Sequence, residues 1–253
     1  GTPLAASIFA LEFFSFKKTD WRFIIPTLLT ALVADWTTTQ WGIQHASYQI
    51  APFQTFSFQN IGRIGVAGMI FGLVAAFYIW TSGFFTNQFS KIKYPPLRTF
   101  IGGAILSLFF LLTAQEKMMG LGLFTIADAF IHEQGQWDFL IKLLITCFTL
   151  SVGFKGGEVT PLFFIGAVLG SSLVFFIPLP ISLLAGLGLI AVFAGATHCL
   201  LSSIVLGIEL FGVEFTLPIV IASTVAYLFS GSKNIYTGRP KDWLKEKLYA
   251  YFL

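Results

Sequence analysis

The sequence predicts an all-α integral membrane protein with several helices. Of its 253 residues, 56% are hydrophobic and only 11% are charged, with a mean hydropathy of +0.81. Soluble globular domains carry about 25% charged residues, so this composition excludes an ordinary soluble fold. Apolar runs such as residues 109–112 do not alternate with polar residues, as strands of a membrane barrel would. The formal charge of +3 is small and scattered, and we expect no nucleic-acid partner.

About nine apolar segments follow one another along the chain, and each is a helix candidate. Apolar stretches such as Ile64 to Trp80 and Phe100 to Thr113 are long enough to enter a hydrocarbon core about 30 Å thick. Segments 181–196 and 199–213 fall short of the roughly 20 residues of a perpendicular span. We therefore expect tilted and broken helices, whose freed backbone groups must face protein or a wet cavity. In chain order the segments are 4–16, 22–37, 61–84, 96–114, 137–153, 160–179, 181–196, 199–213 and 215–230.

An internal repeat is visible between the two ends of the chain. GTPLAASIFALEFF at 1–14 resembles HCLLSSIVLGIELF at 198–211 when Glu12 is aligned with Glu209. Inverted-repeat transporters show weak symmetry of this kind. We expect a single membrane domain, 1–253, truncated at its N-terminus, in which 1–15 end a first repeat half and 16–253 belong mainly to the second. A chance match between two helices rich in leucine and isoleucine is the alternative.

The two aligned glutamates lie at the ends of apolar segments. Carboxylates within membrane helices can relay protons, so Glu12 and Glu209 are candidates for that role. They could instead cap neighbouring helices or face a polar loop. We favour the structural interpretation for both.

The most informative stretch is SVGFKGGEVTPLFFIGAVLG, residues 151–170. Gly156 and Gly157 form a flexible loop, after which Thr160 can cap a helix and Pro161 can occupy its first position. The N-terminal amides of such a helix can bind a small anion. An ordinary glycine-rich loop with a good N-cap fits the same spacing.

Here the sequence resembles a known family. GFKGGEVTP followed by LFFIGAVLG resembles the helix-N motif of the CLC family of chloride channels and anion/proton exchangers. The usual motif is Gly-x-Phe-x-Pro, whereas here Glu158 replaces the phenylalanine and Thr160 precedes the proline, a variant similar to the fluoride/proton antiporter branch. GTPLAASIFALE resembles the family's helix G, ATHCLLSSIVLGIEL resembles helix P, and GSKNIYTGRP resembles the approach to the last membrane helix, with its central tyrosine. The family's Gly-Arg-Glu-Gly-type gating motif is not found in this chain.

The resemblance implies a CLC-type inverted-repeat bundle of tilted and broken helices, present here mainly as the second half. It implies a fluoride/proton antiporter that exports fluoride, without enzyme activity, as a homodimer in a bacterial inner (plasma) membrane. A chloride channel or chloride/proton exchanger of the same family is one alternative, and a non-transporting membrane scaffold fragment is another. The implied pathway residues are Glu158, Thr160 and Tyr236, with the backbone of Gly156, Gly157 and Val159 beside the anion.

The chemistry of these side chains supports the same roles. An ionised Glu158 would compete with an anion, whereas a protonated one would lose its charge and become a hydrogen-bond donor. Glu158 could instead sit in water and pair with Lys155, an interaction worth about 0–1 kcal/mol. Thr160 could satisfy its own helix end or offer its hydroxyl to an ion. Tyr236 could donate to an anion without adding charge, or anchor the chain at the membrane interface.

We expect neither a metal nor a cofactor. His45, His132 and His198 lack a histidine partner at metal-binding spacing, and no glycine-rich nucleotide loop is present. Cys147 and Cys199 lie in apolar runs, where a free thiol behaves as a small hydrophobe.

Overall fold

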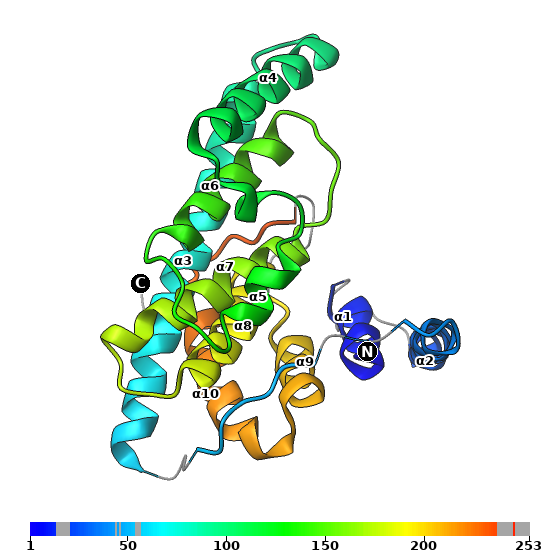
Figure 1. Ribbon diagram of the computed structural model, residues 1–253. Helices are drawn as coiled ribbons and strands as arrows, with labels where there is room; N and C mark the ends of the chain where they lie inside the picture. The colour runs from blue at the N-terminus through cyan, green and yellow to red at the C-terminus, as the bar shows by residue number, and fades with distance from the viewer. Residues whose placement is uncertain (14–20, 44, 46, 54–56, 237–244, 246–253) are drawn as a thin grey trace.

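The structure is a computed structural model that describes all residues except 14–20, 44, 46, 54–56, 237–244 and 246–253 (Figure 1). Within these described ranges the regular elements are helices and no strand occurs, which confirms the predicted all-α class. The α-helices are α1 (Pro3–Phe13), α2 (Ile24–Gln40), α3 (Phe58–Phe89), α4 (Pro95–Thr113), α5 (Leu123–Asp128), α6 (Asp138–Ser151), α7 (Val159–Ser172), α8 (Ile181–Thr197), α9 (Leu200–Phe211) and α10 (Thr216–Phe229).

The observed helices coincide with the predicted segments to within a few residues at most ends, and they include one helix that was not predicted. The six-residue α5 escaped prediction because it is too short for a periodic pattern to emerge. Two helices, α3 and α4, are long and apolar enough to cross a membrane by length and composition.

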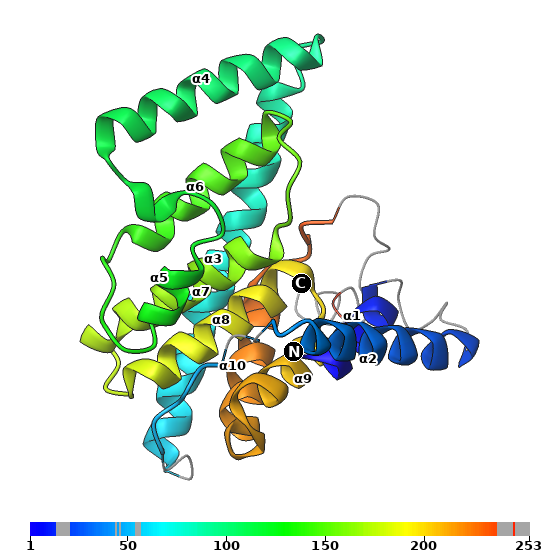
Figure 2. The same cartoon turned by 45° about the vertical axis from the view of Figure 1, so that its right-hand side comes forward.

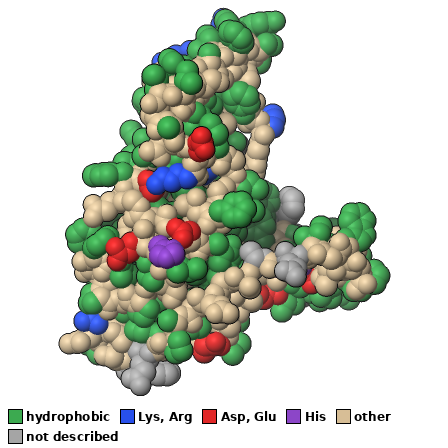
Figure 3. Space-filling model, in the orientation of Figure 1, with side chains coloured by type: hydrophobic (Ala, Val, Ile, Leu, Met, Phe, Trp, Pro, Cys, Tyr) green, Lys and Arg blue, Asp and Glu red, His purple; other side chains and the backbone are tan. Residues whose placement is uncertain are grey.

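Helix α4 lies apart from the packed centre of the protein. In both ribbon views it occupies the end opposite α9 and α10 (Figures 1 and 2). Its apolar side chains are largely uncovered, with Leu111 81% exposed. Hydrophobic side chains cover much of the face seen in Figure 3, including the region of α4. Such a surface suits contact with lipid or with another apolar protein surface.

The core is built on the pair α7 and α8. Nearly every residue of α8 is buried, as expected for a helix that is apolar on all sides. The two backbones touch, because a Cβ added at Gly166 would collide with the carbonyl oxygen of Gly188. Gly170 faces Leu184 in the same way. Small residues permit this close approach, which is a common way of packing helices in membranes.

Helix α3 packs against α6, α8 and α10 around this pair. A Cβ at Gly195 of α8 would lie 2.9 Å from the Cβ of Ala75. On the other side, the thiol of Cys147 donates a hydrogen bond to the carbonyl of Tyr78 at 3.7 Å. The middle of α3 is therefore held between the last turns of α8 and α6.

Helices α1 and α9 pack together and cap one another. The carboxylate of Glu209 accepts hydrogen bonds from the backbone N–H groups of Leu4 and Ala5 at 3.0 and 2.7 Å. The carboxylate of Glu12 accepts two from the first turn of α9 at 3.1 and 2.8 Å. Both glutamates thus satisfy amides that have no partner within their own helix. The favoured capping role is confirmed for both.

Candidate anion pathway

The loop between α6 and α7 is fastened to the start of α4. The Thr99 hydroxyl donates to the carbonyl of Val152 at 2.9 Å. Gly153 has a φ of +105°, in a region that side chains rarely adopt. Beyond it, Gly156 and Gly157 are exposed, so their backbone is accessible ahead of the helix.

Helix α7 begins at Val159, and Glu158 is its N-cap residue. The prediction that Thr160 caps the helix and that Pro161 opens it is wrong, because the helix starts before both. Pro161 can lie after the first helical residue because the N–H groups of a first turn have no acceptor within the helix. The missing N–H of Pro161 therefore costs no hydrogen bond within the first turn, and the sequence signal does not fix the starting residue.

Glu158 is half-buried at this helix start. Its Oε2 is buried without a hydrogen-bond partner among the described residues. No ion pair joins it to Lys155 in the part of the chain that the structure describes. The side chain is therefore a carboxylate next to free helix amides with one oxygen unsatisfied, an arrangement that can accept a proton or face an ion.

Thr160 is the second residue of α7, within its first turn, and is half-buried. Its hydroxyl makes no hydrogen bond within the described residues, and the helix has no side-chain cap. It is thus available to a partner from outside the chain.

Tyr236 is held between the end of α8 and α1. The N–H of Ile235 donates to the carbonyl of Ala196 at 3.1 Å, and the N–H of Tyr236 donates to Asn234 Oδ1 at 2.9 Å. The tyrosine ring meets Phe13 edge-on, with centroids 4.8 Å apart. This packing places Tyr236 within the protein rather than at a free edge.

A row of aromatic rings connects Tyr236 to α7. Phe163 of α7 meets Phe193 of α8 at 5.2 Å, Phe193 stacks on Phe9 at 5.8 Å, and Phe9 contacts Tyr236 at 6.5 Å between centroids. Phe163 is only five residues beyond Glu158. The first turns of α7 and the central tyrosine are therefore parts of one packed unit.

Tyr78 of α3 is a polar residue of this region that the sequence analysis missed. It interacts electrostatically with both Glu158 and Tyr236. A tyrosine inside a long apolar segment carries no motif, so only its surroundings in the structure could identify it.

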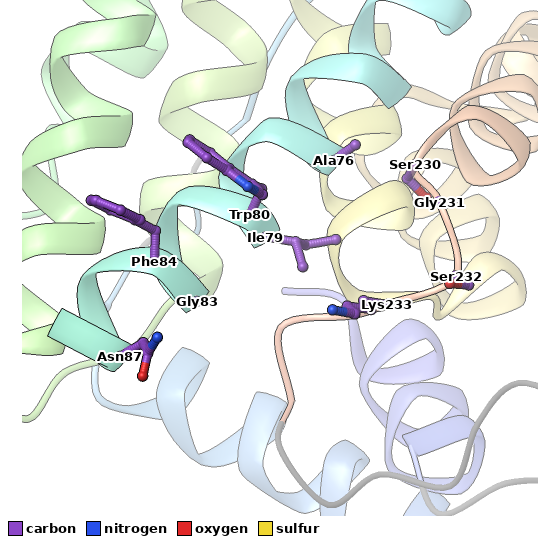
Figure 4. Close-up of a pocket in the computed structure, with 10 residues that line it drawn as sticks. All are labelled: Ala76, Ile79, Trp80, Gly83, Phe84, Asn87, Ser230, Gly231, Ser232 and Lys233. Carbon is purple, nitrogen blue, oxygen red and sulfur yellow. The ribbon is translucent and has the colours of Figure 1, made fainter. Parts of the chain in front are cut away.

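Two clefts approach the region. One, of about 540 Å³, lies between α3 and residues 230–233, and Figure 4 shows Ile79 and Lys233 on its opposite sides. The other, of about 330 Å³, is lined by Gly156, Gly157 and Lys142 among others. Each cleft therefore carries a positive side chain close to the residues expected to line the pathway.

The Lys142 ammonium group is the more deeply placed of these charges. Lys142 is 2% exposed, and it donates to the carbonyls of Met118 and Gly120 at 2.9 and 2.7 Å. No carboxylate pairs with it among the described residues. Lys142 therefore places a buried amine, bound to two backbone carbonyls, in the cleft that the glycine loop lines.

Short apolar helices and a helix start with an unsatisfied carboxylate are typical of the class of membrane proteins built from broken helices. The chain belongs to the CLC family, because the family profile described as voltage gated chloride channel matches residues 1–231.

A curated relative from Pseudomonas syringae pv. tomato, called a chloride/fluoride channel protein, is 37% identical over 245 residues. The match covers 93% of this chain and 54% of the relative, so the chain spans about half of that protein.

Solved structures establish the CLC fold. A CLC-type fluoride/proton antiporter superposes with a TM-score of 0.90 at 34% identity, covering 95% of this chain and 62% of the other. A slow cyanobacterial Cl⁻/H⁺ antiporter gives a TM-score of 0.69 at 20% identity, over 98% of this chain and 61% of the other, and shows the fold alone.

Proposed function

We propose that the full-length protein is a fluoride/proton antiporter that exports fluoride, with Glu158, Thr160 and Tyr236 lining its pathway. The observation that carries the proposal is the Glu158 carboxyl at the N-cap of α7, with its buried and unpartnered Oε2. Similarity to a relative named a chloride/fluoride channel protein and to a solved fluoride/proton antiporter supports the choice of ion.

In this proposal proton movement and anion movement are linked at Glu158. The ionised carboxylate occupies the helix start and excludes an anion by charge repulsion. When it takes up a proton, the repulsion ends and its O–H becomes a donor. The backbone N–H groups of Gly156, Gly157 and Val159 then face the anion.

The hydroxyls account for the preference for fluoride. Fluoride is small and strongly hydrated, so a site must replace its water contacts with short hydrogen bonds. Thr160 and Tyr236 supply such donors without adding a charge that would retain the ion.

The remaining assignments follow from the family. We infer that residues 1–15 end the first repeat half and that 16–253 belong mainly to the second. The protein acts as a homodimer in the bacterial inner membrane. The reciprocal capping of α1 and α9 supports the repeat, because two equivalent glutamates occupy equivalent positions.

The test is fluoride efflux from liposomes that contain the full-length protein, with proton uptake recorded at the same time. Glu158→Gln should lower fluoride-coupled proton uptake by about tenfold or more, because the amide cannot exchange a proton. Glu133→Gln, at an exposed position, is the matched control and should behave as the wild type. Unaltered fluoride and proton rates in Glu158→Gln would remove this residue from the mechanism.

The same assay separates the alternatives. Comparable chloride and fluoride fluxes in the wild type would favour a chloride channel or exchanger. A folded protein that passes neither ion would favour a scaffold.

A further inference from the structure

Helix α3 carries a buried polar group whose hydrogen-bonding capacity is unsatisfied. Tyr78 is 0% exposed, and its hydroxyl has no hydrogen-bond partner among the described residues. Buried hydroxyls are nearly always hydrogen-bonded, and an exception needs an explanation. The ring is large and well packed, so the polar atom at its tip is the feature to explain.

The position of Tyr78 is fixed from two sides. Its carbonyl accepts the Cys147 thiol from α6 at 3.7 Å. One turn earlier, Ala75 lies against Gly195 of α8. The next residue, Ala196, binds the segment that carries Tyr236, through the 3.1 Å hydrogen bond from Ile235.

Glu158 reaches the same region from α7. The side chains of Glu158 and Tyr236 both interact electrostatically with Tyr78, and Cys147 interacts with Glu158. Glu158 Oε2 is itself buried and unpartnered in the described structure. Two unsatisfied polar atoms from different helices therefore share one buried neighbourhood with the central tyrosine.

The Tyr78 hydroxyl and Glu158 Oε2 are not hydrogen-bonded to each other, because neither atom has a hydrogen-bond partner among the described residues. A small species that enters between them would satisfy both. A phenol is a neutral donor, so it suits an anion that must later leave.

Resting on the proposed function, we propose that Tyr78 is a further ligand of the anion pathway, its Oη–H donating a hydrogen bond to the fluoride ion as it passes between Glu158 and Tyr236. The ion that Tyr78 would bind is a small inorganic anion that is a strong hydrogen-bond acceptor. Because the phenol recognises the anion only through a hydrogen bond, its contribution falls as acceptor strength falls from fluoride to chloride.

The experiment compares Tyr78→Phe with wild type in liposomes, using fluoride and chloride efflux and the melting temperature in detergent without fluoride. We expect fluoride efflux to fall about tenfold, the effect of one lost hydrogen bond, and the fluoride-to-chloride ratio to fall with it. The melting temperature should stay the same or rise, since an unpartnered buried hydroxyl has been removed.

Ser223→Ala is the matched control. Ser223 is also buried, and its hydroxyl also lacks a partner in the described structure, but it lies on α10. This variant should leave both fluxes unchanged.

Fluoride efflux within twofold of wild type in Tyr78→Phe would overturn the inference, as would a loss of both fluxes together with a lower melting temperature. If Tyr78→Phe fails to assemble, Tyr78→3-fluorotyrosine keeps the size and strengthens the donor, and an unchanged fluoride-to-chloride ratio would then overturn it. Absence of fluoride flux from the wild type would instead reject the proposed function, so the two failures are distinguishable.

Discussion

Glu12 and Glu209 each close the first turn of the helix that carries the other. The amides of Leu4 and Ala5 donate to Glu209, and those of Leu201 and Ser202 donate to Glu12. Each carboxylate is fully engaged by two N–H groups at the positive end of a helix dipole. Such a contact ties together two segments almost 200 residues apart.

Glu12→Gln and Glu209→Gln should each lower the free energy of unfolding by about 1–2 kcal/mol, because the amide loses the charge and one acceptor. Thermal unfolding in detergent measures this. Glu214 is exposed between α9 and α10, so Glu214→Gln should change the free energy of unfolding little. Altered proton transport at unchanged stability would instead revive the proton-relay interpretation.

Thr160→Val should separate folding from transport. Since the hydroxyl makes no hydrogen bond in the described structure, stability should change by less than about 1 kcal/mol. Fluoride efflux should fall about tenfold, because an ion ligand is lost. Thr99→Val removes the hydrogen bond to the Val152 carbonyl, so it should lower stability and leave fluoride efflux unchanged. A large loss of stability with normal efflux in Thr160→Val would contradict the assignment.

Gly166→Ala should lower stability by about 1–3 kcal/mol, because the added methyl collides with the Gly188 carbonyl. Gly65→Ala on α3 is the control, since no atom lies within 4 Å of its added Cβ. Unfolding of both variants in the same detergent gives the comparison. Equal stability of the two would show that α7 and α8 do not approach as described.

Lys142→Met should destabilise the protein by about 1–3 kcal/mol, because the Met118 and Gly120 carbonyls lose their donor. The apolar replacement avoids the cost of burying an ammonium group, so the net loss is smaller than the two bonds suggest. Denaturant unfolding checks the value. Lys91→Met, at an exposed position, should be nearly neutral, and an equally neutral Lys142→Met would refute the structural role.

Lys233→Gln should lower the rate at which anions enter through the cleft between α3 and residues 230–233. At low ionic strength we expect fluoride efflux to fall about two- to threefold, because the exposed charge concentrates anions near the opening. High salt should abolish the difference by screening. Lys91→Gln serves as the control, and an effect of Lys233→Gln that persists in high salt would argue against steering.

Apolar segment length predicted the main helices well, because membrane helices have an uninterrupted hydrophobic signal. The capping role favoured for the two aligned glutamates was also correct, since each one caps the helix that carries the other. The start of α7 was misplaced, because a proline is tolerated throughout a first turn. Tyr78 could not be found from sequence, because an unsatisfied hydroxyl is a property of its neighbours. Lys142 was missed for a similar reason, since one lysine in an apolar segment does not reveal which carbonyls surround it.

The backbone contact between Gly166 and Gly188 limits how this protein can move. Helix α7 can slide or roll against α8 only if two tightly fitted surfaces separate, so a ratchet of that helix would cost packing energy. Rotation about the side-chain bonds of Glu158 remains, and such rotamer changes are much faster than the microsecond-to-millisecond shifts of whole helices.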